Sequence, residues 1–318
     1  MKILLTGSTG FIGCALHSRL SAQPELSVFG AGKQAPAHER YNCVGEINGN
    51  TDWVSALQDI QVVVHLAARA HVLTAEARDK TALFRETNVD GTLNLARQAA
   101  AAGVKRFIFI SSIGVNGAQT HGEAFDESAS PAPQAAYAIS KYQAEQGLLE
   151  LCKGAAMELV IIRPPLVYGG AAPGNFQRLL KLVASGLPLP FASVNNQRSL
   201  LALENLLDFI ACCIIHPAAA NQLFLPCDGE ALSTAQMMRY LAQGMGRKPR
   251  LFAFPVGLLR WCGGLLGRRV QFDQLCGSLL VDSSKSRDLL GWQPVVSTQQ
   301  ALLKAGREYQ ALRAHGSS

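Results

Sequence analysis

The 318-residue chain has few charged residues and no long uninterrupted apolar run. Only 16% of its residues are charged and 48% are hydrophobic, which excludes an intrinsically disordered chain and a coiled coil. The most apolar stretch, Leu251 to Gly267, contains Pro255 and Arg260 and is too interrupted for a membrane span. Met1-Lys2 leads straight into a short strand pattern without the features of a signal peptide. We therefore expect a soluble, cytoplasmic protein with no integral membrane segment.

The eight cysteines include no C-x-x-C pair and none has a histidine at zinc-finger spacing. This pattern predicts free thiols in a reducing compartment, and neither a structural metal nor a disulfide framework. The formal net charge is +6, and no single tract of Lys and Arg stands out along the chain. A dispersed excess of this size favours a small anionic ligand over nucleic acid as the partner.

Short apolar runs alternate with helical patterns through the first half of the chain. The runs lack polar alternation, which is typical of parallel strands covered on both faces. We expect strands at Ile3–Leu5, Leu26–Phe29, Val62–Leu66, Phe107–Ser111 and Leu159–Ile162. Helices are expected at Gly13–Ala22, Trp53–Leu57, Thr81–Ala102 and Ala136–Cys152. The alternation predicts an α/β fold with a Rossmann-type, doubly wound parallel sheet.

The pattern changes after Arg163, where prolines and glycines crowd a loop that leaves the sheet. Beyond it, helices are expected at Asn175–Ser185, Glu204–Ile215 and Thr234–Gly244, with strands at Ser199–Ala202 and Leu223–Pro226. We assign residues 1–163, with about 199–228, to a dinucleotide-binding domain. Residues 164–198 and 229–318 are assigned to a smaller C-terminal α/β lobe that binds the substrate.

A glycine turn follows the first strand. Gly7, Gly10 and Gly13 form G-x-x-G-x-x-G between that strand and the next helix. The first glycine permits a tight turn, the second lets backbone amides approach a diphosphate, and the third allows close packing of helix on strand. The helix N-terminus adds unpaired N–H groups and a positive dipole. This arrangement predicts a site for NAD or NADP.

The acidic residue that usually holds the ribose 2′-hydroxyl of NAD is missing after the second strand. Lys33 stands there instead, and Arg40 follows a few residues later. Both cations could meet a 2′-phosphate, which favours NADP(H), or both could be ordinary solvated side chains. The pattern therefore favours NADP(H) without excluding NAD.

Tyr137 and Lys141 are spaced four residues apart at the start of a predicted helix, so they share one face. A neighbouring ammonium favours the phenolate and lowers the pKa of the phenol. Such a pair can exchange a proton with a carbinol while a hydride moves. Ser111 and Ser112 end a predicted strand, at the edge of the sheet where ligands bind. One of these hydroxyls can hydrogen-bond the reacting oxygen.

Together these motifs resemble the extended short-chain dehydrogenase/reductase family, and within it the UDP-glucose 4-epimerase group. The likeness extends to Val64-His65-Leu66-Ala67-Ala68, to Asn88, to Arg163-Pro164-Pro165 and to Val281-Asp282-Ser283-Ser284-Lys285. It implies that Ser112, Tyr137 and Lys141 are catalytic. It further implies a homodimer formed through Thr81–Ala102 and Ala136–Cys152.

The resemblance also assigns binding residues. Implied cofactor contacts, taken together with the glycine turn and the Lys33 argument, are Gly7, Gly10, Phe11, Ile12, Gly13, Lys33, Glu46, Ile47, Leu66, Ala67, Ala68, Asn88, Tyr137 and Lys141. Implied contacts to a UDP-sugar are Arg69, Ser112, Asn175 and Arg198. Arg198 corresponds to an arginine that binds the diphosphate, for which a guanidinium fork is well suited. Leu166 replaces an expected asparagine, and Asn175 is expected to supply the amide instead.

Three functions are compatible with these residues. The first is reduction at C4 of a UDP-4-keto-6-deoxy-N-acetylhexosamine, as in the reductases that form UDP-N-acetylquinovosamine for surface polysaccharide such as O-antigen lipopolysaccharide. The second is 4-epimerisation of UDP-glucose or UDP-N-acetylglucosamine with tightly bound NAD. The third is dinucleotide binding without catalysis. The missing acid and the overall similarity favour the reductase, while Ser112, Tyr137 and Lys141 disfavour a non-catalytic protein.

Two further features have alternative interpretations. Residues Lys248 to Arg269 combine arginines with Leu, Phe and Trp, as in a basic amphipathic helix. We favour a helix that packs its apolar face on the substrate lobe, with contact to a membrane surface as the alternative. His65 lies inside an apolar strand and is expected to be a hydrogen-bonded core histidine.

Overall fold

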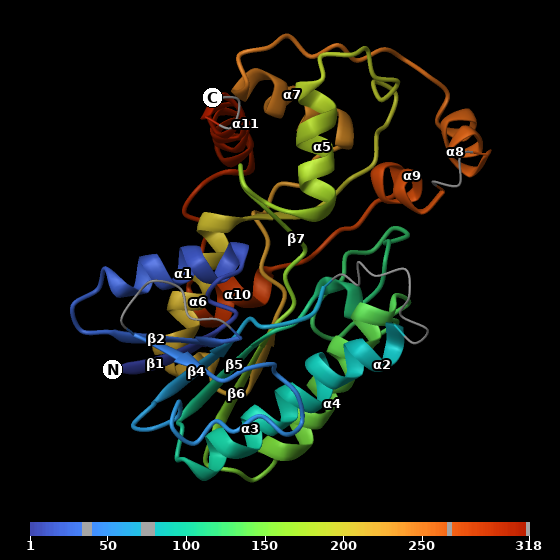
Figure 1. The fold of residues 1–318 in the computed structure, drawn as a ribbon. Coiled ribbons are helices and arrows are strands. Elements are labelled where there is room, and N and C mark those ends of the chain that lie inside the picture. The colour runs from blue at the N-terminus through green and yellow to red at the C-terminus, as the bar shows by residue number, and fades with distance from the viewer. Residues whose placement is uncertain (34–39, 71–79, 266–268, 316–318) are drawn as a thin grey trace.

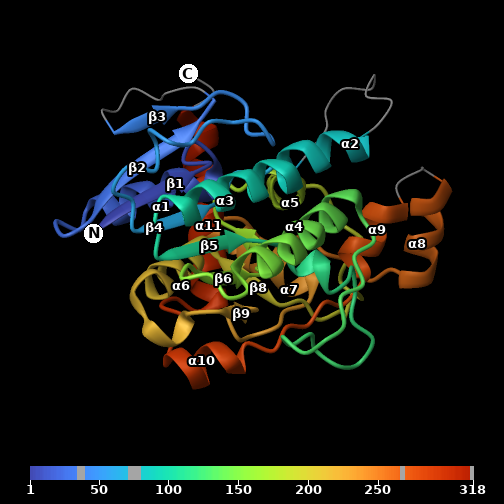
Figure 2. The same ribbon diagram turned by 90° about the horizontal axis from the view of Figure 1, so that it is seen from below.

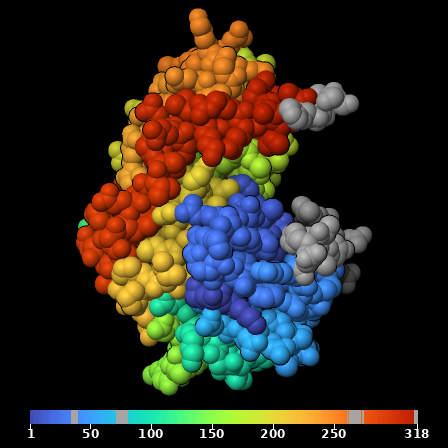
Figure 3. Space-filling view, turned by 90° about the vertical axis from the view of Figure 1, so that its left-hand side faces the viewer, coloured from blue at the N-terminus to red at the C-terminus, as the bar shows by residue number. Residues whose placement is uncertain are grey.

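The computed structural model describes residues 1–33, 40–70, 80–265 and 269–315. Two lobes are stacked on one another, as Figure 1 shows in ribbon form. Figure 3 shows α11 (Thr298–His315, red) crossing the upper lobe, with the N-terminal residues (blue) on the lower one. No helix in the described part of the chain combines the length and the apolar character needed to cross a bilayer.

The lower lobe is built on a seven-stranded parallel sheet. Its strand order is β3-β2-β1-β4-β5-β6-β9. The strands are β1 (Lys2–Thr6), β2 (Ser27–Gly32), β3 (Tyr41–Cys43), β4 (Val62–His65), β5 (Arg106–Ile110), β6 (Glu158–Ile162) and β9 (Gln222–Phe224). All neighbouring strands are parallel, and β1, β4 and β5 are almost completely buried. The five strands expected in the first half are confirmed, and so is the doubly wound α/β fold.

Helices cover both faces of this sheet. The side chains of α1 (Phe11–Ser21), α6 (Leu203–Ile215) and α10 (Ser284–Leu290) share one core with one face of the strands. The side chains of α3 (Thr92–Ala101) and α4 (Ala136–Cys152) share a second core with the opposite face. Figure 2 shows α3 and α4 side by side. This layering buries the strands on both sides, as their continuous apolar sequences predict.

Two expected helices differ from the structure. Trp53–Leu57 is not a helix but a turn, in which Leu57 N–H bonds Trp53 C=O at 2.9 Å and Asp59 soon reverses the chain with a φ of 59°. Thr81–Ala102 is helical throughout but consists of three pieces: α2 (Lys80–Arg85), a π-helix (Glu86–Gly91) and α3. π-Helical turns inside α-helices are rare and frequently occur at functional sites.

The upper lobe contains α5 (Gly174–Ala184), α7 (Thr234–Gly244), α8 (Val256–Leu265), α9 (Arg269–Cys276) and α11. They pack around a separate apolar core with the small sheet of β7 (Leu166–Tyr168) and β8 (Leu200–Ala202). The expected strand at Ser199–Ala202 therefore pairs with β7 instead of joining the main sheet. The assignment of residues 164–198 and 229–318 to a substrate lobe remains a prediction.

Candidate active site

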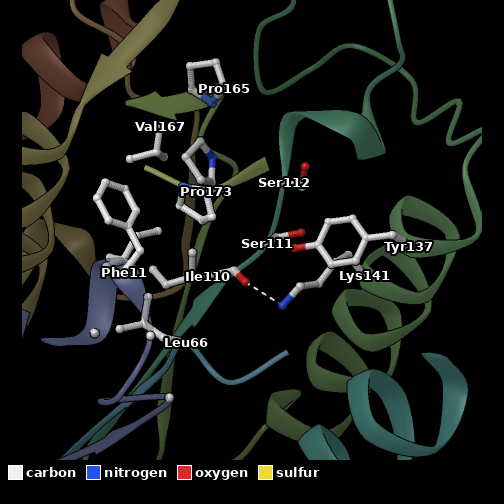
Figure 4. A pocket seen from close by; sticks show the side chains of 15 residues that line it. Phe11, Leu66, Ile110, Ser111, Ser112, Tyr137, Lys141, Pro165, Val167 and Pro173 are labelled. Atoms are coloured by element: carbon white, nitrogen blue, oxygen red, sulfur yellow. Dashed lines mark hydrogen bonds between the residues drawn. The ribbon is translucent and has the colours of Figure 1, made fainter. Parts of the chain in front are cut away.

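A cleft opens at the carboxyl ends of the central parallel strands, between the lobes. It is lined by Gly7, Gly10, Phe11, Ile12, Gly13, Leu66, Ile110, Ser111, Ser112, Tyr137, Lys141, Pro164, Pro165, Val167 and Pro173. In Figure 4, Tyr137 and Lys141 extend from α4 toward the end of β5, where the two serines lie. The structure thus brings the predicted glycine turn and the predicted catalytic residues into one cleft, at the sheet edge where doubly wound folds bind ligands.

The glycine turn leaves no room for side chains. Gly7 has a φ of +70°, and a Cβ there would lie 2.8 Å from the Ala67 nitrogen. A Cβ on Gly13 would lie 2.1 Å from the Gly7 oxygen. Gly10 precedes α1 without any side-chain cap, and the first turn carries no acidic residue. The backbone N–H groups of that turn are therefore suited to an anion, so the cradle fits the diphosphate of a dinucleotide.

Tyr137 and Lys141 share one face of α4, but their pKa values are both set mainly by burial. Burial raises the pKa of Tyr137 to about 12. Burial lowers the pKa of Lys141 to about 7, against the opposing influence of the Glu145 carboxylate. The Lys141 ammonium donates to the Ile110 carbonyl at 2.8 Å and lies 4.4 Å from the centre of the Phe109 ring. The expected lowering of the phenol pKa by Lys141 is thus not present here.

The two serines at the end of β5 differ in their partners. Ser111 is buried and its hydroxyl donates to the Glu145 carboxylate. The Ser112 oxygen accepts from the Gly114 N–H at 3.1 Å and caps a short 3-10 helix (Ile113–Val115). Because Glu145 engages Ser111, Ser112 is the serine whose hydroxyl proton has no acceptor among the described residues. This difference favours Ser112 for contact with a ligand.

A buried ion pair lies behind the serines and was not found in the sequence. The Arg163 guanidinium donates to both Glu145 oxygens, at 3.0 and 2.6 Å, and to the Asn116 amide oxygen at 3.0 Å. Glu145 is fully buried, and Arg163 is 5% exposed. Buried charges of this kind must be paired and hydrogen-bonded. The pair therefore fixes the end of β5 and the loop after β6 relative to α4.

His65 is a hydrogen-bonded core histidine, as expected. Its Nδ1 lies 2.7 Å from the Thr6 hydroxyl, and its Nε2 lies 2.9 Å from the Thr92 hydroxyl. The Thr92 hydroxyl donates to the Asn88 carbonyl, so Nε2 carries the proton and Nδ1 accepts from Thr6. Burial, together with the charge of Lys141, lowers the pKa of His65 to about 3. The neutral ring thereby joins β1, β4 and the helix after them.

Asn88 lies in the π-helix and connects two walls of the site. Its amide oxygen accepts from the Arg69 N–H at 2.8 Å, and its amide nitrogen donates to the Ser140 hydroxyl at 3.0 Å. It also donates to the Arg69 carbonyl at 3.1 Å. Asn88 does not line the cleft. In this structure it holds the chain after β4 against α4.

Other predicted cofactor contacts lie beside the sheet edge and outside this cleft. Lys33 forms an exposed ion pair with Glu46, and that hydrogen bond lowers the pKa of Glu46. Ile47 packs near Gly91, where a Cβ would lie 2.9 Å from the Ile47 side chain. Ala67 donates its N–H to the Thr6 hydroxyl at 3.2 Å, and Ala68 follows it. None of these residues lines the cleft described above.

Two predicted substrate contacts meet at α9. The exposed Asn175 amide donates to the Gln274 side chain at 2.9 Å. The Arg198 guanidinium donates to the Gln274 carbonyl at 2.7 Å and to the Gly277 carbonyl at 3.0 Å. Burial lowers the pKa of Arg198. Both side chains thus approach the end of α9, and neither is among the residues that line the cleft.

Comparison with known proteins supports the same interpretation. Residues 3–224 match the NAD dependent epimerase/dehydratase family. The chain is 43% identical to a UDP-glucose 4-epimerase of Vibrio cholerae, over 97% of this chain and 95% of that protein. It is 29% identical to an N-acetyl-α-D-glucosaminyl-diphospho-ditrans,octacis-undecaprenol 4-epimerase of Escherichia coli O157:H7, over 89% and 88% of the two chains. A UDP-glucuronic acid 4-epimerase from Bacillus cereus, solved in complex with NAD, has a similar fold, with a TM-score of 0.79 at 23% identity over 99% and 98% of the chains. The chain therefore belongs to the NAD dependent epimerase/dehydratase family and is an enzyme of the extended short-chain dehydrogenase/reductase type.

Proposed function

We propose that the enzyme is a UDP-sugar 4-epimerase with bound NAD. The observation that carries the proposal is the 43% identity to a UDP-glucose 4-epimerase along almost the whole chain. The cleft supports it, because a serine, a tyrosine and a lysine from β5 and α4 meet the glycine turn there. The proposal replaces reduction of a UDP-4-keto-sugar, the reaction that the sequence alone favours.

In this reaction the sugar loses a hydride from C4 and a proton from its 4-hydroxyl, and it then regains both with inverted configuration at C4. When bound in the cradle of the glycine turn, NAD would supply the hydride acceptor and donor that this exchange at C4 requires. Tyr137 takes the proton of the 4-hydroxyl as the C4–H bond breaks and gives it back to the oxygen at the end. Ser112 donates a hydrogen bond to that oxygen and holds it in place.

The high pKa of Tyr137 sets a condition for the first step. At neutral pH the phenol is protonated, and burial makes its ionisation still less favourable by raising its pKa to about 12. It can act as a base only when positive charge nearby stabilises the phenolate. Lys141, one helical turn away on α4, supplies that charge in its ammonium form. The pKa of Lys141, about 7, places this charge change near neutral pH.

We infer that the cofactor is NAD and not NADP. Of the two cations expected to meet the 2′-phosphate of NADP, Arg40 is exposed and Lys33 is already paired with Glu46. The Glu46 carboxylate at this position would repel a phosphate and can accept hydrogen bonds from a ribose hydroxyl. The ion pair therefore supports NAD, contrary to what Lys33 alone suggests.

The UDP part of the substrate is expected between the two lobes. Arg198 and Asn175 meet near Gln274, and Arg69 follows β4 on the other side. The partners of the Arg198 guanidinium among the described residues are backbone carbonyls, and a guanidinium can exchange such partners for the stronger charge-assisted bonds of a diphosphate. We propose Arg198 as the diphosphate contact, with Asn175 and Arg69 beside the sugar.

The decisive experiment follows the sugar and the nicotinamide separately. Purified enzyme is incubated with UDP-glucose or UDP-N-acetylglucosamine and a trace of NAD. We expect conversion to the galacto epimer without accumulation of NADH, measured by NMR of the sugar and by absorbance of the dinucleotide. Reduction of a UDP-4-keto-sugar with equimolar NAD(P)H consumption, without epimerisation, would instead establish the reductase.

A variant tests the role assigned to Tyr137. Tyr137→Phe is expected to retain bound NAD and lower epimerisation by at least about 100-fold, the scale for loss of a positioned acid/base. Tyr142→Phe on the same helix is the matched control and should retain full activity. Equal turnover of Tyr137→Phe and the wild type would remove Tyr137 from the mechanism.

A further inference from the structure

The outer edge of the upper lobe exposes several large apolar side chains close together in the chain. Phe252 is 46% exposed, Leu258 is 45% exposed and Trp261 is 61% exposed. Leu258 and Trp261 are three residues apart on α8 and so share one face of that helix. Figures 1 and 2 both place α8 at the margin of the molecule, with α9 between it and the lower lobe. We call Phe252, Leu258 and Trp261 the α8 surface.

The segment that carries the α8 surface packs on the core of the upper lobe. Leu259, on the opposite side of α8, is 4% exposed and belongs to the core of the lobe. The backbone around Phe252 is also fixed: Phe252 N–H bonds the Leu189 carbonyl at 3.0 Å, and the Phe252 carbonyl accepts from Ala192 at 3.1 Å. One side of this segment therefore anchors it, as the cap-helix interpretation expects. The other side presents its apolar groups to solvent.

Positive charge is concentrated in the same segment. Residues 247–276 contain six Lys and Arg residues and a single acidic one, Asp273. This net charge of +5 accounts for nearly all of the +6 of the chain. The excess is thus not dispersed, contrary to what the absence of a continuous basic tract suggests. Among these residues Arg247, Lys248 and Arg250 are exposed and precede Phe252 by two to five positions in the sequence.

Exposed apolar and aromatic groups flanked by cations are the combination that anionic membrane surfaces bind. Tryptophan prefers the lipid headgroup region, where its ring is partly buried and its N–H stays hydrated. Lysine and arginine beside it gain from the negative surface potential of anionic lipids.

We propose that the α8 surface docks the enzyme on an anionic lipid membrane, with Trp261 and Leu258 inserted among the headgroups. The interaction is peripheral and reversible, because only a few apolar groups take part. It depends on both apolar contact and charge, so it should weaken when salt is raised. The proposal is independent of the epimerase reaction.

Tryptophan fluorescence gives a direct readout of this contact. The chain has three tryptophans, and the other two are buried: Trp53 is 0% exposed and Trp292 is 6% exposed. Vesicles of phosphatidylcholine with phosphatidylglycerol should therefore shift the emission of Trp261 to the blue and carry the enzyme upward in flotation. We expect binding to be at least about tenfold tighter than to phosphatidylcholine alone.

Matched variants separate this contact from a change in fold. Trp261→Glu combined with Leu258→Glu should lower vesicle affinity at least about tenfold. Trp261→Phe should keep binding but lose the emission shift. Ile215→Glu, on the distant end of α6 with 72% exposure, is the control and should bind like the wild type. Circular dichroism and epimerase activity establish that each variant is folded.

Several results would overturn the proposal. They are failure of the wild type to float with either vesicle, equal binding to neutral and anionic vesicles, or unchanged binding of the double glutamate variant. A wild-type oligomer that the double variant dissociates, without vesicle binding, would identify the α8 surface as a contact between copies of the chain instead.

Discussion

At the scale of single residues, burial controls the protonation of the groups around the cleft. Tyr137, Lys141 and His65 are each shifted toward the neutral form, by burial above all. Tyr137 and Lys141 line the cleft, so a bound ligand or substrate can change the charge of either side chain. His65 is enclosed by Thr6 and Thr92 and has no such freedom. The folded protein therefore requires the neutral form of His65.

The low pKa of His65 predicts a loss of stability in mild acid. Below pH 6.5, its ordinary pKa, the imidazole of the unfolded chain binds a proton, while the buried ring stays neutral until about pH 3. Acidification therefore favours unfolding, by about 2 kcal/mol between pH 7.5 and pH 5. His65→Gln has no imidazole at this position and therefore lacks this pH-dependent loss of stability. The difference in unfolding free energy between the wild type and His65→Gln should be about 2 kcal/mol smaller at pH 5 than at pH 7.5. Urea titrations at the two pH values measure it.

The exposed His121 provides the control. His121→Gln should keep the pH dependence of the wild type, with the same fall in unfolding free energy on acidification. If the gap between His65→Gln and the wild type stayed constant from pH 7.5 to pH 5, His65 would not be the neutral residue described here.

The site could be predicted from sequence only where its chemistry is local. The glycine turn and the spacing of Tyr137 and Lys141 each lie within a few residues, so their geometry follows from strand and helix periods. The Glu145–Arg163 pair joins α4 to the loop after β6, and no local pattern couples such residues. The choice of Ser112 over Ser111 rests on the family resemblance alone at the sequence level, and the bond from Ser111 to Glu145 that separates them physically has no local signal.

At the scale of elements, a buried carboxylate joins the small β7–β8 sheet to the helices around it. Asp228 accepts from Ala202 N–H at 2.8 Å, the Asn205 amide at 2.7 Å and the Tyr168 hydroxyl at 2.8 Å. Burial raises the pKa of Asp228 to about 6 in spite of these bonds. The Tyr168 hydroxyl also lies 3.2 Å from the Thr298 carbonyl. Asp228 is thus the common acceptor at the junction of β7, β8 and α6.

Removal of this acceptor should destabilise the junction. Asp228→Ala leaves the Ala202 N–H and one Asn205 amide hydrogen without an acceptor and removes one of the two acceptors of Tyr168, and we expect it to lower the unfolding free energy by about 3 kcal/mol. Asp228→Asn keeps an oxygen for Ala202 and Asn205, while Tyr168 can still donate to Thr298. It should lose less than about 1 kcal/mol. Chemical denaturation compares the two, and equal losses would contradict the role given to the Asp228 oxygens.

The elements themselves were largely predictable because each strand of the central sheet is a continuous apolar run. β3 was missed, since Tyr41–Cys43 is short and only partly buried. Trp53–Leu57 was misassigned because its apolar residues, Trp53 and Leu57, are buried by tertiary packing and not by a helical face. The π-helix within the expected helix has no sequence signal, because it depends on Asn88 reaching Arg69 and Ser140.

At the scale of the whole molecule, α3 and α4 form an outer layer over one face of the sheet. They pack closely: a Cβ on Gly147 would lie 2.6 Å from the Leu93 side chain. Their outward side retains apolar groups, with Ile139 36% and Leu149 51% exposed on α4. Figure 2 shows the two helices side by side across the middle of the view. Apolar groups on an outer helix layer favour association of two copies through this face.

We therefore predict a homodimer formed through α3 and α4. In a two-fold symmetric dimer each substituted residue occurs twice in the interface. A charge introduced into each chain therefore destabilises the dimer at two places. Ile139→Glu combined with Leu149→Glu should weaken the dimer at least about tenfold, as measured by light scattering over a dilution series. Leu312→Glu, on α11 with 55% exposure, is the matched control and should stay dimeric. A monomeric wild type, or a double variant as dimeric as the control, would place the contact elsewhere. The vesicle contact of α8 should survive this dissociation, because α8 lies on the upper lobe and the dimer face on the lower one.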